Sequence, residues 1–349
     1  MIKHRTRIDT LERTGYLERD EWIFLLSDFG EADRRYAAER AREVARQYFG
    51  KRIYIRGLIE YTSYCRNNCL YCGLRRDNAK ARRYRLTEEE VLDCCRKGYD
   101  LGFRTFVLQG GEDVYDTDDR LSHMVRRIKS AYPDCALTLS LGEREERSYR
   151  RLYEAGADRY LLRHETADEA HYAMLHPQEM SLAHRKRCLQ QLRDIGYQTG
   201  CGFMVGSPGQ TAETLAADMA FIHRLRPHMI GIGPFLPHRD TPLGEKAAGS
   251  LQLTLFLLSL LRIMEKQVLL PATTALATLQ EDGRQQGILA GANVVMPNLS
   301  PISVRDKYSL YDNKKHTGEE AAEGLEKLRE GMKKIGYEIV SVRGDWEAR

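Results

Sequence analysis

The chain of 349 residues has little excess charge of either sign. Its 54 basic and 50 acidic residues leave a net charge of only +4. Proteins that bind nucleic acids or anionic membrane surfaces through electrostatics usually carry a marked excess of basic residues. The composition therefore gives no reason to expect a nucleic-acid or membrane partner.

The chain also lacks long hydrophobic runs. Its first residues, Met-Ile-Lys-His-Arg-Thr-Arg-Ile-Asp, contain no apolar stretch like that of a signal peptide, and no segment is long enough to span a bilayer. No stretch rich in glycine, serine or proline divides the sequence. We therefore expect a cytoplasmic protein, in which thiols stay reduced.

Metal-binding residues are missing where a fourth ligand would be needed. Cys65, Cys69 and Cys72 follow the spacing C-x3-C-x2-C, and no other cysteine or histidine lies within ten residues on either side. A tetrahedral zinc site is therefore one ligand short, and a disulfide would leave one thiol over. Three thiolates can instead hold three irons of a four-iron, four-sulfur cube and leave the fourth iron open to a small molecule.

The alternative is a chance cluster of buried cysteines, which behave as small hydrophobic residues. The polar residues and the glycine around the three cysteines favour an exposed loop instead. The other five cysteines fall in or beside helical and strand patterns, and we expect them in the core: Cys94, Cys95, Cys135, Cys188 and Cys201.

Short apolar or β-branched runs alternate with amphipathic helical patterns along most of the chain. The predicted strands cover residues 53–60, 105–109, 136–141, 159–164, 199–206, 229–237, 269–275 and 292–297. Helices are expected over 88–101, 120–131, 182–195, 212–225 and 251–266. Eight β-then-α units predict an α/β fold of the (β/α)8 TIM-barrel type. A doubly wound open sheet shares the alternation, but it seldom has eight such even units.

The two ends of the chain extend this pattern. Residues 8–48 have the apolar spacing of helices, and residues 317–334 form a charged amphipathic pattern. We expect residues 1–50 to form an N-terminal helical extension. Residues 51–349 then form the barrel with a C-terminal helix.

Polar and glycine-rich segments follow most of the predicted strands. In a barrel of parallel strands, catalytic groups lie at the carboxyl ends of the strands. Each segment alone is an ordinary turn, with glycine for tight turning and serine, threonine or aspartate for helix capping. Their common position on one rim, beside the three cysteines, indicates a functional site there.

The cysteine loop resembles the signature C-x3-C-x-φ-C of the radical S-adenosylmethionine (SAM) enzymes, in which φ is aromatic and is Tyr71 here. The resemblance implies a barrel that holds one [4Fe-4S] cluster on Cys65, Cys69 and Cys72, which form its catalytic centre. It also implies that the open iron binds SAM, and that one electron cleaves SAM to a 5′-deoxyadenosyl radical.

The segment 109–113, Gln-Gly-Gly-Glu-Asp, resembles the Gly-Gly-Glu motif of the same family. By this resemblance, Gly110 and Gly111 let the backbone approach the methionine part of SAM. The side chain of Glu112, or nearby backbone carbonyls, would receive its ammonium group. A tight turn alone would explain the same residues.

Four further contacts with SAM or an anion follow from the resemblance. Glu165 would bind the ribose, Arg163 an anion, Arg185 the SAM carboxylate, and Met204 would contact SAM. The segment 205–211 resembles the fifth-strand turn that supports adenine in this family, and it lacks the lysine of a P-loop. Locally, a structural Arg163–Glu165 pair on one strand face and a solvated helical arginine at position 185 remain alternatives.

Five longer segments of the sequence resemble the HydE-type [FeFe]-hydrogenase maturases within this family. They are residues 71–78, 155–166, 231–238, 271–275 and 291–298. Biotin synthase and methylornithine synthase are relatives with the same barrel. The resemblance implies action on an iron complex that bears cysteine, carbon monoxide and cyanide, during assembly of the hydrogenase di-iron subcluster. It also implies other hydrogenase maturases as partners, and an electron donor such as ferredoxin or flavodoxin.

Two other functions remain open. One is a radical SAM mutase or synthase that acts on an organic substrate, as methylornithine synthase and biotin synthase do. The other is a non-catalytic iron-sulfur scaffold or electron carrier.

The resemblance also assigns a substrate or anion site deeper in the barrel, lined by Arg163, Thr273, Thr274, Met296, Tyr308 and Tyr311. Some family members carry a second cluster, bound by cysteines late in the chain. No cysteine follows Cys201, so we expect only one cluster. The basic stretch at 75–85 could contact an anionic partner, although a solvated face is the more ordinary interpretation.

Overall fold

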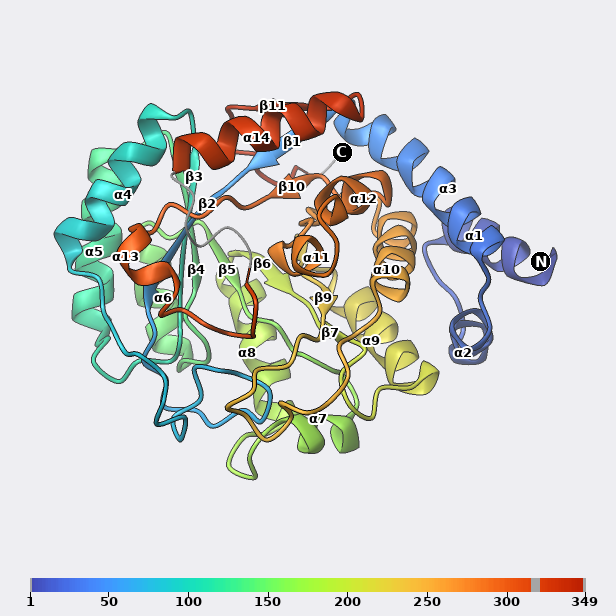
Figure 1. Ribbon diagram of the computed structural model, residues 1–349, viewed down its shortest axis with the longest axis horizontal. Coiled ribbons are helices and arrows are strands. Elements are labelled where there is room, and N and C mark those ends of the chain that lie inside the picture. The colour runs from blue at the N-terminus through green and yellow to red at the C-terminus, as the bar shows by residue number, and fades with distance from the viewer. Residues whose placement is uncertain (1, 315–320, 348–349) are drawn as a thin grey trace.

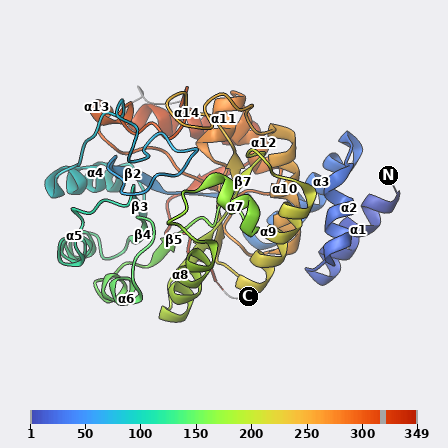
Figure 2. The same cartoon turned by 90° about the horizontal axis from the view of Figure 1, so that it is seen from below.

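A computed structural model describes residues 2–314 and 321–347 of the chain. Its first elements are three helices: α1 (Ile2–Thr14), α2 (Arg19–Ser27) and α3 (Glu31–Phe49). α1 and α3 pack against α10 (Leu251–Met264), and α2 packs against α9 (Ala212–Leu225). Figures 1 and 2 show the three helices together at one side of the molecule. The predicted N-terminal helices are thus confirmed.

A parallel sheet of six strands lies at the centre. Its order is β2 (Gly57–Thr62), β3 (Thr105–Gly110), β4 (Ala136–Ser140), β5 (Arg159–Leu161), β6 (Gln198–Cys201) and β8 (Met229–Ile230). All five strand pairs are parallel. Each helical connection joins a strand to its neighbour in space, and the carboxyl ends of the strands therefore share one rim. The predicted alternation of strands and helices is confirmed over this part.

Two smaller parallel sheets extend the central one. The first contains β10 (Val294–Val295), β1 (Arg52–Ile55) and β11 (Glu338–Val340), and the second pairs β7 (Met204–Val205) with β9 (Gly233–Pro234). β1 runs into β2 with only Arg56 between them. The two larger sheets are therefore continuous through a single polypeptide run.

The predicted strand at 269–275 is mostly absent. Between β8 and β10 the ladder is reduced to two single bridges, Met229–Leu269 and Pro271–Val294. Proline has no N–H to donate to a ladder, and α11 (Thr274–Leu279) already begins three residues later. Residues 269–271 thus connect the two sheets without forming a regular strand.

The remaining helices surround the sheets (Figure 2): α4 (Glu88–Asp100), α5 (Asp118–Ala131), α6 (Glu146–Glu154), α7 (Glu169–Leu175), α8 (Leu182–Ile195), α12 (Gly283–Leu289), α13 (Ile302–Arg305) and α14 (Ala321–Lys334). Serine or threonine side chains cap several N-termini, as at Thr87 and Ser181. α14 confirms most of the predicted C-terminal helix; its predicted residues 317–320 lie outside the described residues.

The hydrophobic core fills the space between the sheets and the helices. The five cysteines outside the motif are buried there, as predicted. Across the described ranges, no helix combines the length and the apolarity that a membrane span requires.

Candidate active site

The three motif cysteines lie on a long loop at the carboxyl ends of the strands. This loop, residues 63–87, leaves β2 and leads to α4 without a helix or strand of its own (Figure 1). Two backbone hydrogen bonds hold it in place: the N–H of Leu70 donates to the carbonyl of Leu175 at 2.9 Å, and that of Gly73 to Leu310 at 3.0 Å. The loop is therefore fixed by α7 on one side and by the segment 308–314 on the other.

The thiols of Cys65, Cys69 and Cys72 lie in a poorly solvated place. Burial raises the pKa of all three, and that of Cys72 to about 12. Buried thiolates are unfavourable without a compensating cation, which bound iron would supply. The backbone N–H groups of Asn67 and Glu112 act on the Cys65 sulfur and lower its pKa in part. Such N–H groups also tune iron-sulfur clusters, so this environment fits a cluster.

The same residues do not form a binding site for a single metal ion. Within residues 2–314 and 321–347, no three cysteine, histidine, aspartate or glutamate side chains gather around one point where a metal ion would bind. In a four-iron cube each thiolate binds a different iron. The cysteines of a cluster loop therefore do not have to converge on one point.

The Gly-Gly-Glu turn lies directly against the cysteine loop. The backbone N–H of Arg66 donates to the carbonyl of Glu112 at 2.9 Å. A Cβ added at Gly111 would lie 2.3 Å from the carbonyl oxygen of Tyr64 and 2.6 Å from the Cβ of Cys65. Only glycine allows so close an approach. The turn at the end of β3 and the loop after β2 therefore form one structural unit.

The carboxylate of Glu112 is already partnered within this unit. It pairs with Arg66 at 3.0 Å and accepts the N–H of Glu143 at 2.7 Å. Glu143 in turn holds Arg185, which also donates to the carbonyl of Arg163 at 2.5 Å. Burial lowers the pKa of Arg185, but the charges of Glu143 and Tyr172 and the hydrogen bond to Glu143 together raise it above its ordinary value, so the guanidinium stays charged. The interpretation of Arg185 as a solvated helical arginine is wrong, because the residue is buried.

Arg163 and Glu165 form an ion pair at 3.0 Å beside this network. The backbone of Glu165 has φ = 65°, which is unusual for a residue with a side chain. The Nε atom of Arg163 is also buried and makes no hydrogen bond to a described residue. Backbone strain and unsatisfied buried polar atoms are concentrated at functional sites. An unusual backbone conformation and an unsatisfied buried donor thus occur together at this pair.

Tyr71 connects the cysteine loop to this pair. Burial raises its pKa, and Glu165 is the next largest cause of the increase, so the two side chains lie close together. The Tyr71 hydroxyl is 3.4 Å from Nε2 of His176. Tyr71 also packs against the cluster of Leu175, Met204 and Phe235. Met204 and Glu165 therefore lie on the same side of the cysteine loop.

Two of the predicted substrate residues also approach this region. Tyr308 is buried, and its hydroxyl accepts a hydrogen bond from Nε2 of Gln109 at 3.4 Å. Burial raises its pKa most, the charge of Glu60 raises it next, and the thiols of Cys72 and Cys65 add to the increase. Burial raises the pKa of Tyr311 to about 12, while the charge of Arg163 acts in the opposite direction. Tyr308 thus lies near the cysteines, and Tyr311 near Arg163.

The other predicted substrate residues have different surroundings from one another. The Thr273 hydroxyl is buried without a hydrogen-bond partner among the described residues, beside Gly233 of β9. The Thr274 hydroxyl accepts a hydrogen bond from Arg284 at 3.1 Å. Met296 packs against a separate hydrophobic cluster that includes Met229. Met296 thus packs against a different hydrophobic cluster from the one that Tyr71 contacts.

Sequence reasoning missed a buried charge pair next to Tyr308. Glu60, which lies within β2, is 1% exposed and pairs with Lys314, while Nδ2 of Asn298 donates to it at 2.8 Å. A glutamate inside an otherwise apolar strand run is the signal that would have found it. Nothing in the local sequence around Lys314 indicates the pairing.

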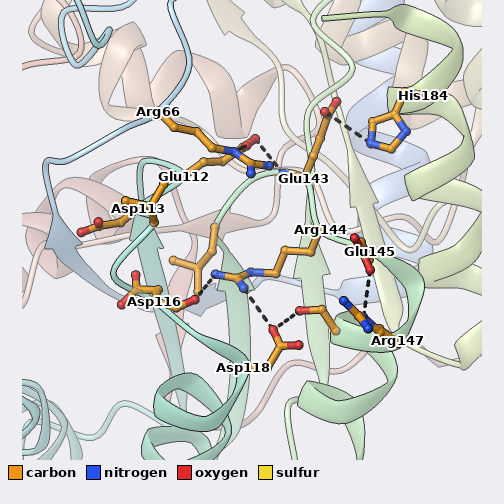
Figure 3. Close-up of a pocket in the computed structure, with 13 residues that line it drawn as sticks. Arg66, Glu112, Asp113, Asp116, Asp118, Glu143, Arg144, Glu145, Arg147 and His184 are labelled. Carbon is orange, nitrogen blue, oxygen red and sulfur yellow. Dashed lines mark hydrogen bonds and ion pairs between the residues drawn. The ribbon is translucent and has the colours of Figure 1, made fainter.

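A cleft of about 550 Å³ opens on the other side of Glu112 (Figure 3). Its charged side chains largely neutralise one another: Arg66 pairs with Glu112, Arg144 with Asp118 at 3.3 Å, and Arg147 with Glu145 at 2.8 Å. Arg163, Glu165 and the predicted substrate residues are not part of its lining. This cleft is thus a neighbour of the cysteine site.

Comparison with known proteins identifies the family to which the chain belongs. The sequence pattern of the radical SAM superfamily matches residues 59–222, which contain the cysteine loop, the Gly-Gly-Glu turn and Glu165. The chain belongs to the radical SAM superfamily of enzymes. Its members use a [4Fe-4S] cluster and SAM, and the cysteine environment described above fits the cluster.

Individual relatives show which members of the superfamily the chain is similar to. The chain is 46% identical over 274 residues to the [FeFe] hydrogenase maturase subunit HydE of Thermotoga maritima, with 78% of each chain covered. It is 28% identical over 318 residues to 3-methylornithine synthase of Methanosarcina acetivorans, covering 90% of this chain and 89% of that one. The crystal structure of methylornithine synthase PylB matches with a TM-score of 0.83 at 26% identity, over 96% and 97% of the two chains.

Proposed function

We propose that the chain is a HydE-like [FeFe]-hydrogenase maturase of the radical SAM type. When bound, the cluster and SAM supply a 5′-deoxyadenosyl radical. The substrate of this radical is an iron complex that bears cysteine, carbon monoxide and cyanide. The 46% identity to HydE over 78% of both chains carries this conclusion, because the methylornithine synthases match at about 30% or less.

The proposed architecture is a (β/α)8 barrel over residues 51–349 with a C-terminal helix, preceded by a helical extension over residues 1–50. The parallel order of β2 to β8 and the single bridges at Leu269 and Pro271 support a ring of eight strand positions. The likeness to methylornithine synthase over nearly the whole chain supports the same architecture.

In this proposal Cys65, Cys69 and Cys72 hold a single [4Fe-4S] cluster. The SAM site consists of Tyr71, Gly110, Gly111, Glu112, Glu165, Arg185 and Met204. The close approach of Gly111 to Cys65 and the position of Glu165 beside Tyr71 support this grouping. Arg185 holds the carbonyl of Arg163 and so links the SAM residues to the substrate site.

The substrate site consists of Arg163, Thr273, Thr274, Met296, Tyr308 and Tyr311. An anionic complex suits it, because the buried Nε of Arg163 and the buried Thr273 hydroxyl make no hydrogen bond to other described residues. Leaving such donors unsatisfied is costly, so a ligand that accepts hydrogen bonds would stabilise them. Other hydrogenase maturases, and a ferredoxin or flavodoxin as electron donor, are the proposed partners.

The test is a product assay under anaerobic conditions. Reconstituted, reduced protein with SAM is given either the synthetic iron–cysteine complex or lysine, and 5′-deoxyadenosine is quantified. We expect the iron complex to increase 5′-deoxyadenosine formation and lysine to leave it unchanged. Turnover of lysine with no response to the iron complex would assign the chain to the methylornithine synthase type instead.

Cysteine variants provide the control for this assay. Cys65→Ala should abolish both the cluster and 5′-deoxyadenosine formation. Cys135→Ala removes a buried cysteine outside the motif and should retain both. If no SAM cleavage above background occurs in the wild type, the chain is a scaffold or an electron carrier and not a radical enzyme.

A further inference from the structure

The short helix α7 contacts two parts of the candidate active site and closely follows a third. The carbonyl of Leu175, at the end of the helix, accepts a backbone N–H of the cysteine loop at 2.9 Å. Residues 206–211, which we call the β7 turn, lie against the same helix, because a Cβ added at Gly209 would be 2.5 Å from Cε of Met174. The helix begins shortly after Glu165. It is thus placed between the cysteine loop, the β7 turn and the segment that carries Glu165.

The imidazole of His171 in α7 connects two of these segments. Its Nδ1 lies 3.0 Å from the Thr166 hydroxyl, and its Nε2 lies 3.2 Å from the Pro208 carbonyl oxygen and 3.1 Å from the Ser207 hydroxyl. Thr166 directly follows Glu165, and the other two residues belong to the β7 turn. One buried side chain therefore bridges the Glu165 segment and the β7 turn.

These contacts fix which ring nitrogen of His171 carries the proton. The Pro208 carbonyl can only accept a hydrogen bond, so Nε2 donates. Nδ1 of the neutral ring then accepts the hydrogen bond of the Thr166 hydroxyl. Burial lowers the pKa of His171, which favours this neutral form. The ring thus makes a directed hydrogen bond toward each segment, and at 2% exposure it has little access to water that could replace either bond.

Both bridged segments carry residues of the proposed SAM site. The N–H of Met204 donates to the carbonyl of Glu165 at 3.2 Å, and the Met204 carbonyl accepts Nε2 of Gln210 in the β7 turn at 2.7 Å. The turn is therefore folded back onto Met204. Glu165 has φ = 65°, and such a conformation persists only where its surroundings hold it in place. The bond between Thr166 and His171 is one such constraint.

We propose that His171 is a positioning residue for SAM, which fixes the β7 turn against the segment that carries Glu165. The inference rests on the proposed function, in which Glu165 and Met204 contact SAM. His171 acts through these two segments and does not itself touch SAM. A purely structural histidine would contribute to stability alone, whereas a positioning residue also sets the affinity for SAM, because binding depends on the placement of the contacting groups.

Two substitutions break the bridge at opposite ends. Thr166→Val has nearly the same shape as threonine but removes the hydroxyl that donates to Nδ1 of His171. His171→Asn places its amide near the position of Nδ1, so it keeps an acceptor for the Thr166 hydroxyl and loses the contact with the β7 turn. The double variant breaks both ends. If the bridge acts as a unit, the second substitution should add little to the first.

Two further variants are the controls. Thr166→Ser keeps the hydroxyl and should therefore retain the bridge. His228→Gln removes a histidine contact away from the rim, where Nδ1 of His228 accepts the N–H of Thr199 at 2.9 Å in β6. Urea unfolding of the cluster-free proteins gives the stability of each variant. If His171→Asn does not fold, the comparison of Thr166→Val with Thr166→Ser decides.

Calorimetry of the reconstituted protein with an oxidised cluster gives the Kd for SAM, because no electron is available for cleavage. We expect Thr166→Val and His171→Asn each to raise this Kd about tenfold, which corresponds to about one lost hydrogen bond. The double variant should resemble the weaker single variant, and both controls should match the wild type. Electron paramagnetic resonance of the reduced proteins at saturating SAM should show the same SAM-induced change in all of them.

Three outcomes would overturn the inference: an unchanged Kd in both single variants, an equal loss of affinity in Thr166→Ser and Thr166→Val, or fully multiplied effects in the double variant. The wild type separates these failures from a failure of the proposed function. If SAM neither binds the wild type nor changes the spectrum of its reduced cluster, the proposed function itself is wrong.

Discussion

Among single residues, Gly111 is central to the structure of the cysteine site. It is the point at which the turn after β3 approaches the loop that holds Cys65. Both atoms that a methyl group would meet there, the carbonyl oxygen of Tyr64 and the Cβ of Cys65, belong to the backbone or lie next to it. Neither atom can move without shifting the cysteine loop.

We therefore predict that Gly111→Ala displaces the cysteine loop. Overpacking of this kind costs about 1 to 3 kcal/mol of stability, and the displaced Cys65 sulfur should bind iron less well. Iron content after reconstitution and urea unfolding of the cluster-free protein measure the two effects. Gly231→Ala is the control, because its added Cβ would have contacts no closer than 3.9 Å. Equal iron content in both variants would contradict the structural role of Gly111.

Residue patterns could predict the cysteine motif and the polar strand ends, because spacing and residue type carry that information. They could not predict the partners of Arg185. The sequence left it between a SAM contact and a solvated position, whereas the structure buries it against Glu143 and the carbonyl of Arg163. That burial depends on the packing of α8 against the sheet, which no local pattern encodes.

Among the structural elements, the segment 308–314 connects several parts of the chain at the rim of the sheet. Leu310 accepts a hydrogen bond from Gly73 of the cysteine loop, and Asp312 donates its backbone N–H to the carbonyl of Pro237 after β9. Lys314 then pairs with Glu60 of β2. The segment thus joins β2 and its following loop to the segment after β9, and it carries Tyr308 and Tyr311.

We predict that Lys314→Met destabilises the protein strongly. Glu60 is 1% exposed, and removal of one partner from a buried ion pair costs about 3 to 5 kcal/mol because a charge is left uncompensated. The double variant Lys314→Met with Glu60→Gln removes that charge and should regain a large part of the loss. Urea unfolding of the cluster-free proteins measures both, and a double variant no more stable than the single one would refute this explanation.

The longer helices and most strand positions could be predicted from periodicity and capping residues, and the structure confirms them. The strands predicted at 199–206 and 229–237 are each divided into two short strands that belong to different sheets. The strand expected at 269–275 was not formed, because Pro271 lacks a donor and Thr274 begins α11. β11 and the rim segment 308–314 were missed, because each is short and is defined by contacts with residues far away in the sequence.

At the scale of the whole molecule, the parallel sheets place the carboxyl ends of the strands on one rim. The cysteine loop, the Gly-Gly-Glu turn, Glu165 and Tyr308 come from different parts of the chain and meet there. α1 to α3 pack against α9 and α10 and are not part of this rim. The alternating pattern of the sequence predicted this convergence, whereas the choice of substrate rests on the relatives of the chain.

In our proposal, the site at the cysteine loop acts on an iron–cysteine complex. Electron paramagnetic resonance of the reduced, reconstituted protein, freeze-quenched with SAM and the synthetic complex, tests it most directly. We predict an organic radical signal that requires both SAM and the complex, and that disappears in Cys65→Ala. A protein that cleaves SAM yet gives the same spectrum with and without the complex would contradict it.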